Sequence, residues 1–247
     1  MSTWLLDLGN SRLKLAPLEA AGMPGAVVAV DHDGAGFDPS LAAALPQPGA
    51  TAWLCSVASP ALREVLVSWL DARGMRVEAP RVAREFGGVR IGYADPARLG
   101  VDRALAMAAV RVRSASPALV VGVGTALTID LLDAAGLHLG GRIAPSPGLM
   151  RAALHARARQ LPAEGGHAVG FADDTADALA SGCMDAALGA IERSQRDARV
   201  RLGAMPCTWL HGGGAAALAG ELPGARQAPH LVLEGLAHLA RAARAAG

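Results

Sequence analysis

The chain has 247 residues, of which 52% are hydrophobic and 18% are charged, and this composition excludes a disordered protein. The formal net charge of +1 provides no strong field for nucleic acid or an anionic membrane surface, so neither is expected as a partner. The 3 cysteines form no CxxC pair, which favours reduced thiols in a cytoplasmic protein. No signal peptide is predicted, and the longest apolar stretch, 118–129, is too short to span a bilayer.

The segment WLLDLGNSRLKL, residues 4–15, concentrates polar residue types that are rare elsewhere in the chain. Asn10 is the only asparagine and Lys14 is the only lysine. An apolar run leads into Asp7 and Gly9, which predicts a strand, a tight turn and a second strand. Such a turn could hold a phosphate and its metal. The alternative is an ordinary hairpin turn at Gly9-Asn10, and the segment alone does not decide between them.

The rest of the first half alternates apolar strands with helical periods. Pro60 suits the first turn of a helix, and Leu62, Leu66 and Leu70 follow it with helical spacing. We expect strands at 26–30, 51–57 and 75–82, helices at 61–73 and 96–113, and irregular segments at 31–40 and 85–95.

A second strand-turn-strand pattern, ALVVGVGTALTIDLLD, occupies residues 118–133 and echoes the first. Gly124 aligns with Gly9 at an offset of 115 positions, which is about half the chain. One short match is weak evidence for a repeat, but the half-length spacing supports it. Each half also begins with strands and continues with helices, as an α/β layer does. The sequence therefore predicts two α/β domains, residues 1–115 and 116–247.

The remainder of the second half contains further helical and strand patterns. Asp174 and Thr175 have the chemistry of a helix N-cap. We expect a strand with a Gly-Gly bulge at 137–143, a strand at 205–210, and helices at 147–160, 175–193, 215–222 and 231–246.

Two glycine-rich motifs have competing interpretations. HGGG at 211–214 is similar to the oxyanion loop of some lipases, but no GxSxG elbow accompanies it. Its glycines more readily indicate a backbone that passes close to a phosphorylated ligand, and a plain flexible turn is the alternative. The glycines at 122 and 124 lack the third glycine and the helix of a dinucleotide fold, and no P-loop motif is present.

Isolated ionisable residues carry little information by themselves. Asp102 and Arg103 before a helical run are typical of a surface ion pair or of a charged helix start. Tyr93, the only tyrosine, lies in a glycine-rich segment upstream, where it could simply be a packed ring. Three histidines are expected at the surface or in loops rather than as ligands: His138, His167 and His230.

Taken together and in chain order, six segments resemble the type III pantothenate kinases, a family that includes Bvg accessory factor homologues. These segments are DLGNSRLK at 7–14, GVDRALA at 100–106, VGTALTID at 123–130, GGRIAPSPGLM at 140–150, residues 175–182, and HGGGA at 211–215. The resemblance implies two ribonuclease-H-like halves of the actin, Hsp70 and sugar kinase type around an ATP cleft. It also implies a homodimer with pantothenate near its interface. The implied reaction transfers the γ-phosphoryl group of ATP to pantothenate, the first step towards coenzyme A.

The resemblance assigns nucleotide-binding roles to two loops and one glycine segment. The first phosphate loop comprises Asp7, Leu8, Gly9, Asn10, Ser11, Arg12, Leu13 and Lys14. Asp7 would hold Mg²⁺ through water, and the polar side chains would donate to phosphate oxygens. Thr125 would contact ATP from the second phosphate loop, residues 122–125. Gly212 and Gly213, within 212–214, resemble the loop on the adenosine side.

The resemblance also assigns the acceptor site. Asp102 matches the general base, which orients the acceptor hydroxyl and takes its proton late. Arg103 is suited to the pantothenate carboxylate because a guanidinium binds a carboxylate as a fork. The implied substrate-binding residues are Tyr93, Gly100, Val101, Asp102, Arg103 and Thr175. His155 is a further candidate that could reach substrate from a neighbouring subunit.

Two positions depart from the family pattern. Gly122 stands where the family usually has an acid that helps to hold a monovalent cation, so the K⁺ or NH₄⁺ site is doubtful, and Asp130 is no obvious replacement. Ser146 stands where the family has glycine, which would add strain if the backbone there had positive φ. One alternative is therefore a catalytically impaired, nucleotide-binding accessory or regulatory protein. Another is a kinase of the same fold that acts on a different hydroxylated molecule.

Overall fold

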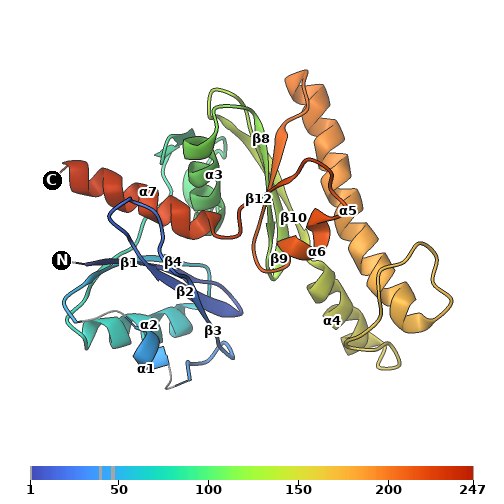
Figure 1. Cartoon of the computed structure of the whole chain (residues 1–247), viewed down its shortest axis with the longest axis horizontal. Helices are drawn as coiled ribbons and strands as arrows, with labels where there is room; N and C mark the ends of the chain where they lie inside the picture. Colours follow the sequence, from blue (N-terminus) through green and yellow to red (C-terminus); the bar gives the residue numbers. More distant parts are fainter. Residues whose placement is uncertain (1, 39–40, 46–47, 247) are drawn as a thin grey trace. The chain divides into compact units, whose positions relative to one another are not determined.

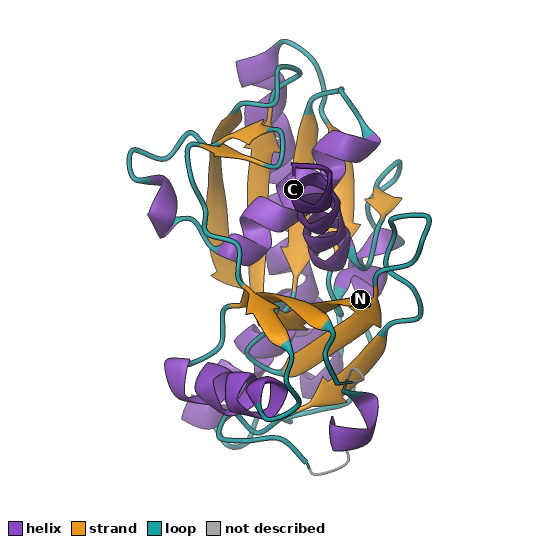
Figure 2. Ribbon diagram, turned by 90° about the vertical axis from the view of Figure 1, so that its left-hand side faces the viewer, coloured by secondary structure: helices purple, strands orange, loops and turns teal. Residues whose placement is uncertain are grey.

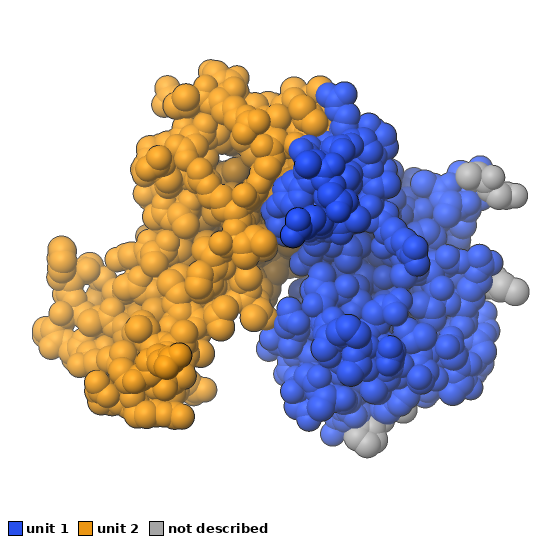
Figure 3. Space-filling view, turned by 180° about the vertical axis from the view of Figure 1, so that it is seen from behind, with its two compact units in different colours: residues 1–114, 230–247 blue, residues 115–229 orange. Residues whose placement is uncertain are grey.

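The computed structural model describes residues 2–38, 41–45 and 48–246 and divides the chain into two compact units (Figure 3). Unit 1 contains residues 1–114 and 230–247, and unit 2 contains residues 115–229. The break after Ser114 lies one residue from the expected domain boundary. The C-terminal segment differs from the expectation, because residues 230–247 belong to the first unit rather than the second.

Unit 1 is built on a sheet of five strands in the order β3-β2-β1-β4-β5, counted within the described residues (Figure 1). β1 pairs antiparallel with β2 and parallel with β4, so it lies at the centre of the sheet. The expected strand-turn-strand at residues 4–15 is therefore confirmed. The strands are β1 (Thr3–Leu8), β2 (Arg12–Pro17), β3 (Val28–Asp31), β4 (Thr51–Ser56) and β5 (Arg76–Glu78).

The helix α2 (Pro60–Asp71) covers one face of this sheet. The Ser59 hydroxyl accepts a hydrogen bond from Leu62 N at 3.2 Å, and Pro60 occupies the first turn, as its fixed φ favours. The leucine stripe of α2 packs in one buried cluster with the side chains of Leu6 and Leu8. The short helix α1 (Leu41–Ala44) also belongs to unit 1, and the expected loop at 31–40 is described only as far as Asp38.

The helix expected at 96–113 is divided in two. A 3-10 turn, η1 (Pro96–Arg98), is separated from α3 (Val101–Arg113) by Leu99 and Gly100, whose ψ angles of 132° and 131° are extended. The segment before it contains a two-stranded hairpin, β6 (Glu85–Phe86) and β7 (Val89–Arg90), where an irregular segment was expected. Gly100 is therefore the N-cap of α3, and the acid at position 102 lies in its first turn.

The helix α7 (Leu231–Ala246) returns to unit 1 and packs on α3, β1 and β4. Leu233 and Leu236 are fully or almost fully buried. A Cβ atom at Gly235 would overlap the backbone oxygen of Leu105, so the two helices touch backbone to backbone there. Glu234 accepts two hydrogen bonds from the Arg113 guanidinium, at 2.6 and 2.8 Å. These contacts are the physical reason that the C-terminal helix belongs to the first unit.

Unit 2 repeats the topology of unit 1, with the strand order β10-β9-β8-β11-β12 in its described part. Figure 2 shows helices against the sheet of each unit. β8 pairs antiparallel with β9 and parallel with β11, as β1 does with β2 and β4. The expected duplication is confirmed. The strands are β8 (Ala118–Val123), β9 (Ala126–Leu132), β10 (His138–Pro145), β11 (Cys207–His211) and β12 (Arg226–Gln227).

Three helices belong to unit 2: α4 (Pro147–Arg157), α5 (Thr175–Leu202) and α6 (Ala215–Ala219). α5 is capped by Asp174, as expected, but it continues past residue 193 until Gly203 adopts φ +74°. It covers the sheet face that carries Val121 and Val123. These positions correspond to Leu6 and Leu8 under the 115-residue offset, so equivalent faces of the two sheets are covered.

One histidine expectation is wrong. His138 is fully buried, and its Nε2 atom lies 2.9 Å from Oδ1 of Asp130, which is also buried. A buried polar side chain needs such a partner, so this pair is a structural element of the β9–β10 ladder. The expected Gly-Gly bulge is confirmed, because the register of β10 shifts between His138 and Gly141. Among the helices in the described residues, none combines the length and apolar character that a membrane-spanning helix requires.

Candidate active site

The first site feature is a row of three side chains across the sheet of unit 1. Asp7, the penultimate residue of β1, lies opposite Lys14 on β2 and opposite Cys55 on β4. Because side chains alternate along a strand, this row lies on the sheet face that α2 does not cover. The Cys55 thiol donates a hydrogen bond to the Asp7 carboxylate. Cys55 had no signal in the sequence, because strand register cannot be read from composition.

The environment of Asp7 raises the pKa of its carboxyl group from 3.8 to about 6. Burial is the largest cause, the charge of Asp102 adds to it, and the charge of Lys14 opposes it. Burial and the same two carboxylates also raise the pKa of the Cys55 thiol well above its ordinary value. Asp102 is therefore close enough to Asp7 to act on it, so the structure brings the expected base and the expected metal-binding acid together in unit 1.

Two carboxylates near one another in a half-buried site suit a divalent cation. Among the described residues there is no group of three or more His, Cys, Asp or Glu side chains that could hold a metal. A metal at Asp7 would thus take its remaining ligands from phosphate oxygens and water, as Mg²⁺ in phosphoryl-transfer sites does. The donor set fits Mg²⁺ bound together with a nucleotide.

The first phosphate loop is held by backbone bonds and by the end of β3. Gly9 N donates to Arg12 O at 2.9 Å, and a ring nitrogen of His32 lies 2.9 Å from Gly9 O. The Arg12 guanidinium is paired with Asp31 at 2.6 Å in an exposed ion pair. The side chains of Leu8 and Leu13 are fully buried, so these two expected binding residues can offer a ligand only their backbone. The side chains of Asn10 and Ser11 are exposed.

Asp102 is positioned by the start of α3. A Cβ atom at Gly100 would lie 2.6 Å from Oδ1 of Asp102, so the carboxylate folds back over the N-cap residue. Any residue other than glycine at position 100 would displace this carboxylate. The resemblance singled out Gly100 as a substrate-binding position, and the structure shows that it also leaves room for the Asp102 carboxylate.

Tyr93 and Arg103 also lie together. The Arg103 guanidinium is buried and sits 5.9 Å from the centre of the Tyr93 ring, within cation–π range. The Arg84 guanidinium donates to the backbone oxygens of Ile91, Tyr93 and Ala94, at 2.7, 2.7 and 3.0 Å. Arg84 thus holds the segment that carries Tyr93. Sequence analysis missed it, because an exposed arginine in an irregular segment has no distinguishing pattern.

Unit 2 contains the equivalent row at the second phosphate loop. Gly122 lies opposite Thr128 on β9 and opposite His211 on β11. A Cβ atom at Gly122 would lie 2.6 Å from the Thr128 hydroxyl oxygen and 2.8 Å from His211 Nε2. These two side chains therefore occupy the space beside the glycine. Asp130 does not replace an acid at position 122, because it is buried with His138.

Ser146 ties the second phosphate loop to a helix. Its hydroxyl donates to Thr125 O at 2.9 Å and accepts from Leu149 N at 3.3 Å, which makes it the N-cap of α4. Its φ of −70° is ordinary, so the strain considered for a serine at this position is not present. The departure from glycine adds a hydrogen bond to Thr125.

The glycine segment after β11 is pressed against the end of β8. Gly212 has φ +93°, and a Cβ atom there would lie 2.5 Å from Val123 O. Gly214 N donates to the same oxygen at 3.0 Å. Glycine is needed at position 212 both for its backbone conformation and for this close approach. The structure thus places the expected adenosine-side loop next to the second phosphate loop within unit 2.

Thr175 is not brought to the phosphate loop of its own unit. It is the exposed first residue of α5, and Asp174 caps the helix by accepting from Ala176 N and Asp177 N at 2.7 and 3.0 Å. This end of α5 extends with α4 beyond the sheet of unit 2 (Figure 1). If Thr175 contacts substrate, the other residues that bind that substrate must therefore lie outside the start of α5.

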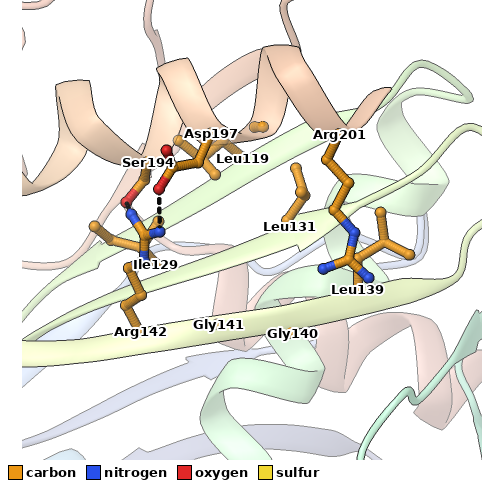
Figure 4. A pocket seen from close by; sticks show the side chains of 11 residues that line it. Leu119, Ile129, Leu131, Leu139, Gly140, Gly141, Arg142, Ser194, Asp197 and Arg201 are labelled. Carbon is orange, nitrogen blue, oxygen red and sulfur yellow. Dashed lines mark hydrogen bonds and ion pairs between the residues drawn. The ribbon is translucent and has the colours of Figure 1, made fainter. Parts of the chain in front are cut away.

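A cavity of about 260 Å³ lies beneath α5 in unit 2 (Figure 4). Leucine and isoleucine side chains of the sheet form its floor, and Arg142 at its rim donates to Ser194 at 2.7 Å and to Asp197 at 2.5 Å. Its lining includes Leu119 and Ile129, which face α5. It is therefore on the opposite sheet face from Gly122, and none of the expected site residues lines it.

Solved structures of other proteins share this fold. One, described as a Baf family transcriptional activator from Campylobacter jejuni, is 19% identical with a TM-score of 0.66 and covers 98% of this chain and 99% of that chain. Another, described as a 2-dehydro-3-deoxygalactonokinase from Sinorhizobium meliloti, is 17% identical with a TM-score of 0.59 and covers 99% of both chains. Together with the repeated sheet topology, these likenesses confirm the duplicated α/β fold of the actin, Hsp70 and sugar kinase type.

Sequence relatives define the family. A type III pantothenate kinase from Stenotrophomonas maltophilia (strain K279a) is 53% identical over 240 residues, which are 97% of this chain and 98% of the relative. The family model described as type III pantothenate kinase matches residues 4–197. The chain belongs to the type III pantothenate kinase family, as its resemblance predicted.

Proposed function

We propose that this protein transfers the γ-phosphoryl group of ATP to the primary hydroxyl of pantothenate, giving 4'-phosphopantothenate in the first step of coenzyme A biosynthesis. Family membership supports the reaction, and the observation that carries it is the proximity of Asp102 to Asp7 in unit 1. A base for the acceptor and an acid for the metal are the two groups that such a transfer requires. A cytoplasmic location is part of the proposal, because ATP and Mg²⁺ are supplied there.

The catalytic role of each group follows from phosphoryl-transfer chemistry. Asp7 would hold Mg²⁺ through water, and the ion would supply positive charge to the phosphates during transfer. Lys14, Asn10 and Ser11 donate to phosphate oxygens from the first phosphate loop. Asp102 accepts a hydrogen bond from the acceptor hydroxyl, orients it in line with the phosphorus and takes its proton late in a loose transition state.

Pantothenate is held by the α3 start and the segment that Arg84 fixes. Arg103 binds the pantothenate carboxylate as a fork, and its contact with the Tyr93 ring keeps the guanidinium plane oriented. Gly100 and Val101 offer backbone next to the base. The positive charge of Arg103 next to Asp102 in the sequence supports a carboxylate-bearing acceptor over a neutral sugar.

Each unit, taken by itself, contains one loop whose chemistry suits phosphate. Gly9 in the first loop and Thr125 in the second approach the phosphates, and Gly212 and Gly213 pass along the adenosine side. Their glycines and short polar side chains suit close backbone contact with an anion. Ser146 supports this role by fixing the carbonyl of Thr125.

A homodimer completes the proposal. Of the described residues of α4, none is buried, and Leu149 and Leu154 are 41% and 45% exposed. Phe171, in the loop between α4 and α5, is fully exposed. Apolar side chains gathered on one projecting element favour a protein interface. Thr175 and His155, which lie on this same α4–α5 arm, would then serve the acceptor site of the second copy.

We expect the kinase rate of this protein to depend less on a monovalent cation than the rate of relatives that have an acid at the position of Gly122. The glycine offers no charged ligand, and the adjacent space is filled by Thr128 and His211. Comparing kinase rates in potassium and in sodium tests this expectation. A steep requirement for potassium or ammonium would refute it.

The reaction is tested with purified protein, ATP, Mg²⁺ and pantothenate, by measuring formation of the phosphorylated product. Asp102→Asn should lower kcat by about 100-fold or more, the usual contribution of a positioned base. Absence of activity in the wild type, with potassium or ammonium present, would contradict the function and favour the catalytically impaired alternative. Near-normal activity of Asp102→Asn would contradict only the assignment of the base.

A further inference from the structure

The two cross-strand rows can be compared position by position. In unit 1 the row is Lys14–Asp7–Cys55, and in unit 2 it is Thr128–Gly122–His211. Both central residues are penultimate in the first strand of their sheet, and both precede the turn glycine by two positions. Each is flanked by one antiparallel and one parallel neighbour. The rows are therefore structural equivalents, but the second contains no carboxylate.

The second row instead presents two hydrogen-bonding groups above a glycine. The Thr128 hydroxyl oxygen and His211 Nε2 both lie within 2.8 Å of the point that a Cβ atom at Gly122 would occupy. Both side chains are only partly buried, so they can be reached by a ligand. They lie on the sheet face opposite to α5, which is the face equivalent to that of Asp7.

The backbone on either side of this pair is fixed. Gly212, directly after His211, is in contact with Val123 O, and Gly214 N donates to that oxygen. His211 itself is the last residue of β11, hydrogen-bonded within the sheet beside Gly122. The imidazole is therefore carried by rigid backbone and not by a mobile loop, which is a requirement for a binding group that acts without reorganisation.

We propose that His211 and Thr128 bind a phosphoryl oxygen of the nucleotide directly, and that position 122 is glycine because a side chain there would displace this pair. An imidazole N–H and a hydroxyl can both donate to an anionic oxygen. The row itself contains no carboxylate, and the next acid along β9, Asp130, is buried with its Oδ1 atom 2.9 Å from His138 Nε2. The proposal rests on the proposed ATP-dependent function, and it deepens the role of the second phosphate loop.

Equilibrium binding of ATP and of adenosine to the purified wild type and to four variants tests this inference. His211→Phe keeps a ring of similar size but removes both nitrogens, and it should weaken ATP binding by about tenfold or more while adenosine binding stays unchanged. His211→Gln keeps a side-chain amide donor and should lose less ATP affinity than His211→Phe does. Thr128→Val, a near-isosteric change, should weaken ATP binding by a few fold. His167→Gln, at an exposed histidine of the same unit, is the matched control and should bind as the wild type does.

Three outcomes would overturn the inference. One is ATP binding by a folded His211→Phe protein within twofold of the wild type. Another is an equal loss of ATP and adenosine affinity, which would indicate a structural role. The third applies if His211→Phe does not fold. In that case, wild-type affinity for ATP in both His211→Gln and Thr128→Val would contradict the proposal. A wild-type protein that binds ATP but does not phosphorylate pantothenate would contradict the proposed function and leave this test intact.

Discussion

Asp7 is the residue whose folded environment most alters its chemistry. Its pKa of about 6 exceeds the ordinary value of 3.8, so the folded state binds a proton more tightly than the unfolded chain does. Below about pH 4 the Asp7 carboxyl group is protonated in both the folded and the unfolded state, so it does not lower the free energy of unfolding. As the pH rises from 4 to 6, only the unfolded state ionises, and stability is lost. Above pH 6 the penalty is complete, at most about 3 kcal/mol for a shift of this size.

Asp7→Asn should therefore stabilise the protein in the absence of nucleotide and metal. The gain should be absent near pH 4, grow up to pH 6 and remain constant above it, because the amide never ionises. Thermal unfolding at several pH values measures it, with Asp173→Asn, at an exposed acid, as the control. The same substitution should abolish kinase activity, since it removes the acid that we propose holds Mg²⁺. A loss of stability above pH 6 would contradict this account of Asp7.

Arg84 is expected to affect the affinity for pantothenate but not the affinity for ATP. Arg84→Met keeps the aliphatic stem and removes three hydrogen bonds to the segment 91–94. The KM for pantothenate should rise roughly tenfold, because Tyr93 would no longer be held beside Arg103. The KM for ATP should stay unchanged. Steady-state kinetics measure both, and Arg81→Met, at an exposed arginine nearby, serves as the control.

At the scale of elements, the packing of α7 on α3 depends on one glycine. Gly235→Ala would place a methyl group into the backbone oxygen of Leu105, which cannot rotate away as a side chain could. We expect a loss of about 2 kcal/mol or more, seen as a lower unfolding midpoint. Gly189→Ala on α5 is the matched control, because no atom lies within 4 Å of its Cβ position. It should be neutral or stabilising by up to about 1 kcal/mol, from helix propensity. Equal effects of the two changes would contradict the close helix contact.

Elements with a strong local signal were predicted well. The helix start at Pro60, the cap at Asp174 and the Gly-Gly bulge of β10 are set locally, and each was in its expected place. Helix and strand features that depend on contacts with residues distant in sequence were not predicted. The short β12 exists because it pairs with β11, and the helix expected at 96–113 is interrupted at Gly100 so that Asp102 can lie over it. No local pattern distinguishes these cases.

The candidate site shows the same limit. Ordered motifs indicated Asp7, Asp102 and Thr125, because family patterns lie along the chain. Cys55 became visible only through strand register, which joins residues that are distant in sequence, and Thr128 lay within a motif but was linked to Gly122 only by that register. His211 was noted as part of a glycine motif, and its position beside Gly122 required the structure. Sequence reasoning therefore finds the residues within motifs and misses the neighbours that set their environment.

For the whole molecule, the important feature is that unit 1 is discontinuous in sequence. A chain that ends at Pro229 would lack α7, which contributes three buried leucines, Leu231, Leu233 and Leu236. Each buried leucine contributes roughly 2 kcal/mol, so the loss is comparable to the whole stability of many domains. We expect this shortened protein to be unfolded in unit 1, as measured by amide hydrogen exchange, and to bind no ATP. Native protection of β1 and β4 in it would contradict the assignment of α7 to unit 1.

The return of α7 to unit 1 also determines the order of events on the ribosome. Residues 1–114 emerge first, but their sheet face that awaits α7 stays uncovered while all of unit 2 is synthesised. That face carries Asp7 and Cys55, so the surface proposed to be catalytic is among the last parts of unit 1 to be enclosed. A nascent chain of this kind exposes apolar strand surface for the time needed to translate 115 further residues, which is when chaperones would be expected to bind it.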